Sequence, residues 1–217
     1  MFVLLASISH LQKTDNSCAR LSIWHTRAYV IGVQTALQLL NVDVHEDALE
    51  LERFGATLHE KFGAIGSEYD AVWHRAASPK DSADLFLAEW ESFVITGKVG
   101  VAKESPSKID GVIDLTADLP NVELKPRFYF ATPDITYLKA WFDGVRFVST
   151  YFGGLPIQPD IEAFDSWLRR QTVSNPSCPW EMILTSMCGG DVALAFTKFF
   201  EELRRFNQTS VVSCELK

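Results

Sequence analysis

The segment TPDITYLKAWFDGVRFVSTYFGG, residues 132–154, decides the fold class of this 217-residue chain. Thr132, Pro133 and Asp134 form a helix-start pattern of cap residue, proline and first-turn acid. Apolar side chains then recur at helical spacing: Tyr137, Trp141, Val145, Val148 and Phe152. Further apolar residues lie between them, and a helix that is apolar on nearly every face is usually central and buried. The segment therefore predicts a mainly helical protein built around this helix.

Similar start and stop signals recur along the chain. Ser78 followed by Pro79 predicts the start of a helix that ends at Gly97. Asp43 resembles the cap residue of a capping box, and it starts a predicted helix that ends at Gly63. Further helices are expected near residues 21–40, 67–76, 161–170, 180–188 and 192–206.

Strand-like segments are fewer and shorter than the helical ones. Four of them are candidates: residues 2–9, 111–115, 122–130 and 209–215. Strands and helices do not alternate, so a doubly wound parallel sheet is not expected. The predicted fold class is α+β and predominantly helical, with about seven or eight helices and a small sheet of three to four strands.

The length fits a single globular domain over residues 1–217. Helical periodicity is lost only in residues 98–121, which mix lysine, aspartate and proline. This stretch is therefore the candidate domain boundary.

Charge and cysteine spacing restrict the function classes. The formal net charge of −8 disfavours general nucleic-acid binding, which needs basic groups to replace the counterions of phosphates. No stretch approaches the roughly 20 apolar residues of a membrane span. The four cysteines are widely spaced and contain no C-x-x-C pair, which favours reduced thiols and a cytoplasmic location. We expect neither a membrane nor a nucleic-acid partner.

Familiar catalytic and metal-binding motifs are missing from the sequence. Gly97 and Lys98 lack the remaining residues of a P-loop, and no G-x-S-x-G sequence occurs. No two histidines have the helical spacing of a metalloprotease. The sequence therefore predicts no catalytic residue, no metal ligand and no cofactor.

Acidic residues are concentrated in one part of the chain. Between Asp43 and Asp70 there are eight acidic residues and only two basic ones. A solvated helix face with acids in its first turn would account for this pattern. The other interpretation is a recognition surface for a basic protein, because complementary charge speeds association and selects partners. Its predicted partner-binding residues are Asp43, Glu46, Asp47 and Glu50. The last three lie about one turn apart, and we expect them to face away from the apolar stripe of the helix.

Three hypotheses about function remain open. The first is a non-catalytic protein-binding protein, an immunity- or antitoxin-type inhibitor that neutralises a basic, nuclease-like toxin through its acidic face. The second is an enzyme with dispersed catalytic residues, such as a hydrolase that pairs Cys188 with a histidine. The candidate histidines are His25, His45, His59 and His74. The third is a structural subunit of a homo-oligomer, and the sequence does not predict the oligomeric state.

Overall fold

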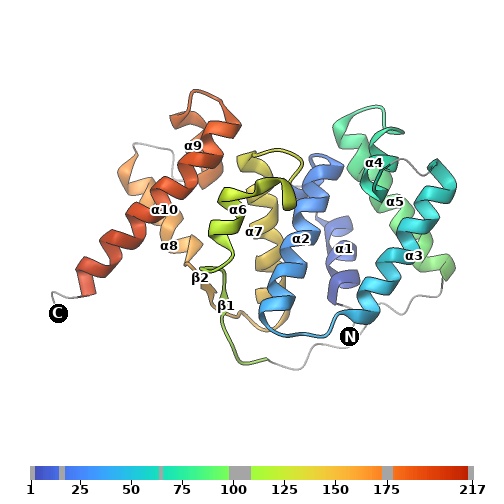
Figure 1. The fold of residues 1–217 in the computed structure, drawn as a ribbon, viewed down its shortest axis with the longest axis horizontal. Coiled ribbons are helices and arrows are strands. Elements are labelled where there is room, and N and C mark those ends of the chain that lie inside the picture. Colours follow the sequence, from blue (N-terminus) through green and yellow to red (C-terminus); the bar gives the residue numbers. More distant parts are fainter. Residues whose placement is uncertain (1–2, 15–17, 64–65, 98–108, 173–177, 215–217) are drawn as a thin grey trace. The chain divides into compact units, whose positions relative to one another are not determined.

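The computed structural model describes residues 3–14, 18–63, 66–97, 109–172 and 178–214 (Figure 1). This part of the chain contains ten α-helices, so the predominantly helical prediction is confirmed. They are α1 (Val3–Lys13), α2 (Ile23–Leu39), α3 (His45–Phe62), α4 (Glu68–Trp73), α5 (Pro79–Gly97), α6 (Leu119–Leu124), α7 (Ile135–Tyr151), α8 (Ile161–Gln171), α9 (Trp180–Met187) and α10 (Val192–Cys214). Two 3₁₀ turns, η1 (Cys18–Arg20) and η2 (Pro126–Phe128), complete the helical elements.

The sheet is smaller than predicted. Within the described residues it is one parallel pair, β1 (Ile113–Asp114) and β2 (Ile157–Gln158), and not a sheet of three to four strands. The amide of Leu115, just after β1, donates a hydrogen bond of 2.7 Å to the carbonyl oxygen of Gln158. Of the four predicted strands, only the one at 111–115 contains a strand in the structure.

The three wrong strand predictions have a common cause. Within the described residues, 3–9 lie in α1, 122–130 span the end of α6 and η2, and 209–214 continue α10. A short apolar run has the same composition in a strand and in a buried helix, so periodicity alone does not separate them. In α1 the buried side chains Leu4, Ile8 and Leu11 recur at helical steps of four and three.

Most predicted helix ends agree with the structure. Gly63 ends α3 with a φ of 97°, and Ser67 starts α4 with a complete capping box. Two starts differ by a few residues. Val44, and not Asp43, is the cap residue of α3. The cap residue before α7 is Asp134 and not Thr132. The Asp134 carboxylate accepts a hydrogen bond of 2.7 Å from the amide of Thr136.

The chain divides into two compact units. Unit 1 comprises Met1–Ile113 and Ala140–Leu155, and unit 2 comprises Asp114–Lys139 and Pro156–Lys217. The first division lies inside the stretch 98–121 that the sequence marks as a candidate boundary, while the second falls within α7. Two compact units can belong to one domain, so the single-domain assignment stays a prediction.

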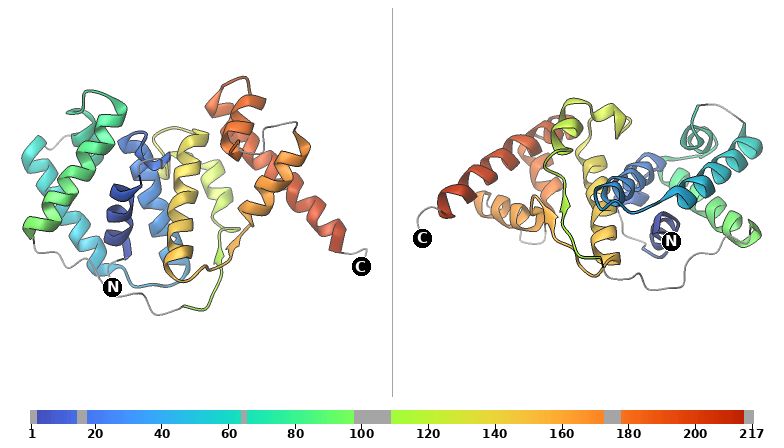
Figure 2. Two further views of the ribbon diagram at one scale, coloured as in Figure 1. Left: turned by 180° about the vertical axis from the view of Figure 1, so that it is seen from behind. Right: turned by 60° about the horizontal axis from the view of Figure 1, so that its bottom comes forward.

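Unit 1 depends on a close crossing of α2 and α7, which lie side by side in both views (Figures 1 and 2). A Cβ atom at Gly32 would overlap the carbonyl oxygen of Trp141. A Cβ atom at Gly144 would overlap the carbonyl oxygen of Tyr29. Because each helix has a glycine at the crossing, the two backbones approach more closely than any side chain would allow.

Aromatic rings join α3, α4 and α5 within the same unit. The ring of Phe54 on α3 meets Phe86 and Trp90 of α5 edge-on, at centroid distances of 5.2 and 5.0 Å. Tyr69 of α4 stacks on Phe86 at 5.5 Å. Both geometries are favourable for aromatic pairs, and they fix the relative positions of these three helices.

Unit 2 has its own aromatic core between α8, α9 and α10. Phe199 of α10 contacts Phe164 of α8 at 5.3 Å and Trp180 of α9 at 5.0 Å. Asp191 caps α10 by accepting hydrogen bonds from the amides of Ala193 and Leu194. In the described part of the chain, no single helix is long and apolar enough to cross a membrane. The segments Trp180–Met187 and Val192–Thr209 meet that test only as a pair bent by 110°.

Candidate functional site

Asp47, one of the four predicted partner-binding residues, lies inside the protein. Its side chain is fully buried, and its carboxylate accepts hydrogen bonds from the amides of Leu4 and Leu5, at 3.2 and 3.3 Å. Burial raises the pKa of Asp47, while the hydrogen bonds from the backbone of α1 oppose that shift. Asp47 therefore satisfies the first turn of α1 and does not belong to a recognition surface.

The sequence contains a signal for this burial. Asp47 precedes Phe54 by seven positions and Leu58 by eleven, and both of these residues are buried. Residues seven and eleven apart share one face of an α-helix. The spacing thus places Asp47 on the apolar side of α3, and the prediction that it faces away from that side was wrong.

The other three predicted residues have different surroundings. Asp43 and Glu46 are exposed near the start of α3. Glu50 is only 20% exposed, and its carboxylate accepts a hydrogen bond of 2.6 Å from the guanidinium of Arg53. Of the four predicted carboxylates, two therefore remain available to a partner.

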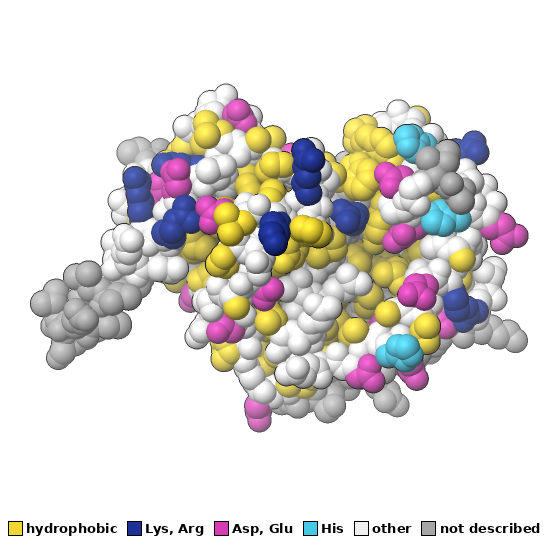
Figure 3. Space-filling model, viewed as in Figure 1, with side chains coloured by type: hydrophobic (Ala, Val, Ile, Leu, Met, Phe, Trp, Pro, Cys, Tyr) yellow, Lys and Arg dark blue, Asp and Glu magenta, His cyan; other side chains and the backbone are white. Residues whose placement is uncertain are grey.

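The acidic surface is larger than the predicted set. Twelve acidic and only four basic residues lie between Asp43 and Glu91, so the excess charge of this stretch equals that of the whole chain. This stretch forms α3, α4 and α5, and we call it the acidic lobe. Figure 3 shows acidic and histidine side chains spread over its visible face. Six of its carboxylates are exposed and have no recorded ion pair within the described residues: Asp43, Glu46, Glu52, Glu60, Asp81 and Glu91.

A groove of about 430 Å³ is lined by residues of α2, α3 and α4, and one of the six exposed acids, Glu52, belongs to this lining. We call it the α3 groove. Its lining is Gln34 from α2, Ala48, Leu51, Glu52, Gly55, Ala56 and His59 from α3, and Glu68 from α4. The six α3 positions share one helix face, and three of them carry glycine or alanine. Because these three side chains are small, they leave the space that forms the groove.

The capping box of α4 fixes the position of Glu68. The Ser67 amide and hydroxyl both donate to the Asp70 carboxylate, at 2.8 and 2.7 Å. Burial alone would raise the pKa of Asp70, but these hydrogen bonds outweigh it and lower the pKa. Glu68 follows the cap directly, and its side-chain carbons lie 3.6 to 3.9 Å from the place where a Cβ of Gly55 would stand.

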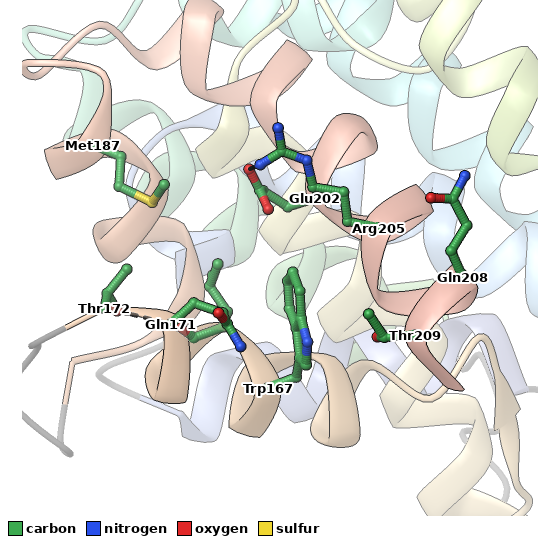
Figure 4. A pocket seen from close by; sticks show the side chains of 9 residues that line it. Trp167, Gln171, Thr172, Met187, Glu202, Arg205, Gln208 and Thr209 are labelled. Atoms are coloured by element: carbon green, nitrogen blue, oxygen red, sulfur yellow. Dashed lines mark hydrogen bonds and ion pairs between the residues drawn. The ribbon is translucent and has the colours of Figure 1, made fainter. Parts of the chain in front are cut away.

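A second groove, of about 680 Å³, lies within unit 2 (Figure 4). Trp167 of α8 forms part of its wall, and Arg205 and Gln208 line it from α10. Its buried carboxylate, Glu202, accepts hydrogen bonds from Lys198 at 3.0 Å and from Arg205 at 2.9 Å. Because this carboxylate is already paired, the groove has no unpaired buried charge that would select an occupant.

The hydrolase hypothesis gains no support from Cys188. Burial raises the pKa of its thiol, as do Asp191 and Glu201, although Lys198 opposes the shift. A catalytic cysteine needs the opposite shift, since the thiolate is the nucleophile. All five histidines lie in the sequence of unit 1, so Cys188 has no histidine in its own unit.

His25 is paired with a serine. The Oγ atom of Ser22 lies 2.8 Å from Nδ1 of His25, and both residues are buried. Ser22 is also the cap residue of α2 and accepts a hydrogen bond from the His25 amide. This contact therefore has a structural explanation as part of a helix cap. Across the described residues, no group of three or more histidine, cysteine or acidic side chains is arranged to hold a metal ion.

Comparisons with protein-family models, with curated proteins and with solved structures find no match to this chain. Inference about function therefore depends on the charges and grooves described above.

Proposed function

We propose that this chain is a non-catalytic protein-binding protein that engages a basic partner through the acidic lobe. The observation that supports the proposal is the concentration of the net charge in α3, α4 and α5, where six exposed carboxylates have no recorded ion pair. A surface of one sign attracts a partner of opposite sign and raises the association rate.

The proposal includes a class of partner. A nuclease-like toxin is basic around its active site because it must attract phosphates. Carboxylates presented by an inhibitor can bind the same basic groups and exclude the nucleic acid from the active site. We therefore propose, on the basis of charge complementarity, an immunity- or antitoxin-type inhibitor.

Charge reversal on α3 tests the proposal. A variant with Glu46→Lys, Glu52→Lys and Glu60→Lys changes exposed residues only. Asp47 stays unchanged, because a lysine there would bury an ammonium group beneath α1. The control reverses three glutamates of unit 2, Glu123, Glu162 and Glu201, and so has the same net charge. Because Glu123 pairs with Arg204 and Glu201 pairs with Lys198, thermal melting checks that this control keeps its fold.

Both variants and the unaltered protein serve as baits in extracts of the source organism. We expect a basic protein to be retained by the unaltered protein and by the unit 2 control, and lost from the α3 variant. The binding is then measured with the purified partner by calorimetry at low and high salt. Equal retention by all three baits, or retention of no basic protein, would contradict the proposal.

A further inference from the structure

We infer that the α3 groove receives an arginine side chain of a bound protein, with Glu52 and Glu68 as the carboxylates that hold its guanidinium group. The inference rests on the proposed function in one respect, since a protein partner has to supply the arginine. It adds a defined contact point to what is otherwise a broad charged surface.

The shape of the α3 groove is the first argument. Its volume of about 430 Å³ lies within the range of specific ligand pockets. Ala48, Gly55 and Ala56 provide a small-residue wall, and Leu51 provides apolar surface. An arginine side chain has an apolar stem as well as a charged end, so it suits a groove with both kinds of lining.

Charge is the second argument. Glu52 and Glu68 enter from different helices, and no lysine or arginine is among the eight lining residues. The nearby Arg27 of α2 lies over the ring of Tyr69, 6.0 Å from its centroid, and does not line the groove. The described residues therefore leave two carboxylates in the groove without a recorded cationic partner.

These features favour arginine over lysine. A guanidinium group is planar, spreads its donors over several directions and is more weakly hydrated than an ammonium group. It can therefore bond to carboxylates on two helices at once and loses less hydration on entering the groove. The capping box of Ser67 and Asp70 orders the backbone from which Glu68 extends, and this reduces the ordering cost of binding.

The test is a titration of the ¹⁵N-labelled full chain, followed by NMR, with the peptide acetyl-Gly-Ser-Arg-Ser-Gly-amide. We expect chemical-shift changes at groove residues, with a dissociation constant on the order of millimolar for this single contact. The same peptide with citrulline, which has the shape of arginine but no charge, should not bind. The lysine peptide should bind more weakly than the arginine peptide.

Variants separate charge from shape. Glu52→Gln and Glu68→Gln should each weaken arginine-peptide binding at least about tenfold, the effect of losing roughly 1.4 kcal/mol. Ala56→Leu should block binding with both carboxylates intact. Glu201→Gln, an exposed acidic position in unit 2, is the control and should leave binding unchanged. Thermal melting of each variant checks that the fold is kept.

The outcomes distinguish this inference from the proposed function. Equal binding of the arginine and citrulline peptides, or unchanged binding in Glu52→Gln and Glu68→Gln, would overturn the arginine site. If the arginine site is overturned but a basic partner is still captured in a way that depends on α3 charge, the proposed function is retained. Arginine-specific binding without any captured basic protein would support the groove and remove the proposed function.

Discussion

The carboxylates of the two units have different partners. In unit 2 the carboxylates of Glu123, Asp165 and Glu202 are all bound by cationic side chains of the same unit. In the acidic lobe of unit 1, Glu52 and Glu60 are exposed and have no recorded ion pair in the described structure. Unit 2 therefore pairs these three acids with its own cations, while the acidic lobe of unit 1 presents unpaired carboxylates whose negative charge can attract another molecule.

The two buried carboxylates repeat this difference. Asp47 in unit 1 accepts hydrogen bonds from the backbone amides of Leu4 and Leu5. Glu202 in unit 2 is held by Lys198 and Arg205. Free surface acids add self-repulsion to a folded protein, and the packing contacts of unit 1 have to offset it. The glycine crossing of α2 and α7 is the main candidate.

Gly144→Ala should have the largest effect on the fold. The added methyl group would overlap the carbonyl oxygen of Tyr29 in the middle of α2, and neither backbone can move without disturbing the crossing. We expect a loss of about 3 kcal/mol in the free energy of unfolding, measured by urea denaturation. Glu60→Gln in the same unit should change it by less than about 0.5 kcal/mol. Comparable effects from the two variants would contradict the view that packing, and not charge, stabilises unit 1.

Asp47→Ala and Glu202→Ala compare the two ways of holding a buried carboxylate. Removing Asp47 leaves amides at the start of α1 buried without an acceptor, and we expect a loss of about 2 kcal/mol. Removing Glu202 should cost about 1 kcal/mol, because Lys198 and Arg205 are 25% and 63% exposed and can be hydrated. Urea denaturation measures both. A larger loss of stability for Glu202→Ala than for Asp47→Ala would mean that the ion pairs of Glu202 stabilise unit 2 more than exposed ion pairs usually do.

The pH dependence of Asp47 and Asp70 should have opposite signs. The pKa of Asp47 is raised by burial, so its contribution to stability is greatest in the protonated form and falls as pH rises from 3.8 through the raised value. The pKa of Asp70 is lowered by the hydrogen bonds from Ser67, which outweigh its burial. Its contribution is therefore present above 3.8 and is lost as pH falls through the lowered value.

Denaturation of Asp47→Ala and Asp70→Ala across the acid range checks both signs. The penalty of Asp47→Ala relative to the unaltered protein should grow on acidification, and that of Asp70→Ala should shrink. Parallel curves would show that one of the two carboxyl groups has a pKa shifted in the other direction.

The sequence predicts the helices better than the contacts between them. Ser67, Pro79 and Gly63 mark helix ends through local hydrogen bonding and backbone geometry, and these act over a few residues. Residues 2–9 were mistaken for a strand because an apolar run of that length does not reveal its period. The burial of Asp47 is visible in its spacing from Phe54, but its hydrogen bonds to α1, 43 residues away, come from tertiary structure.

The α3 groove was missed for the same reason. The small residues Ala48, Gly55 and Ala56 share one helix face, which the spacing shows. The second carboxylate, Glu68, reaches Gly55 only because aromatic packing and the α4 cap position the next helix. A sequence pattern records which residues share a face, and it does not record which other helix covers that face.

The smallest expected effect concerns the surface acids themselves. Glu52→Gln with Glu60→Gln should raise the free energy of unfolding slightly, by less than about 0.5 kcal/mol, because it removes like charges that repel one another. Glu123→Gln should lower it by up to about 1 kcal/mol, since the carboxylate binds Arg204 at 2.7 and 3.0 Å. Both differences should fade in 1 M salt, where screening acts over roughly 3 Å. A loss of stability from the α3 pair at low salt would mean that these acids have stabilising partners within the fold, and a free acidic surface would then no longer explain the charge of unit 1.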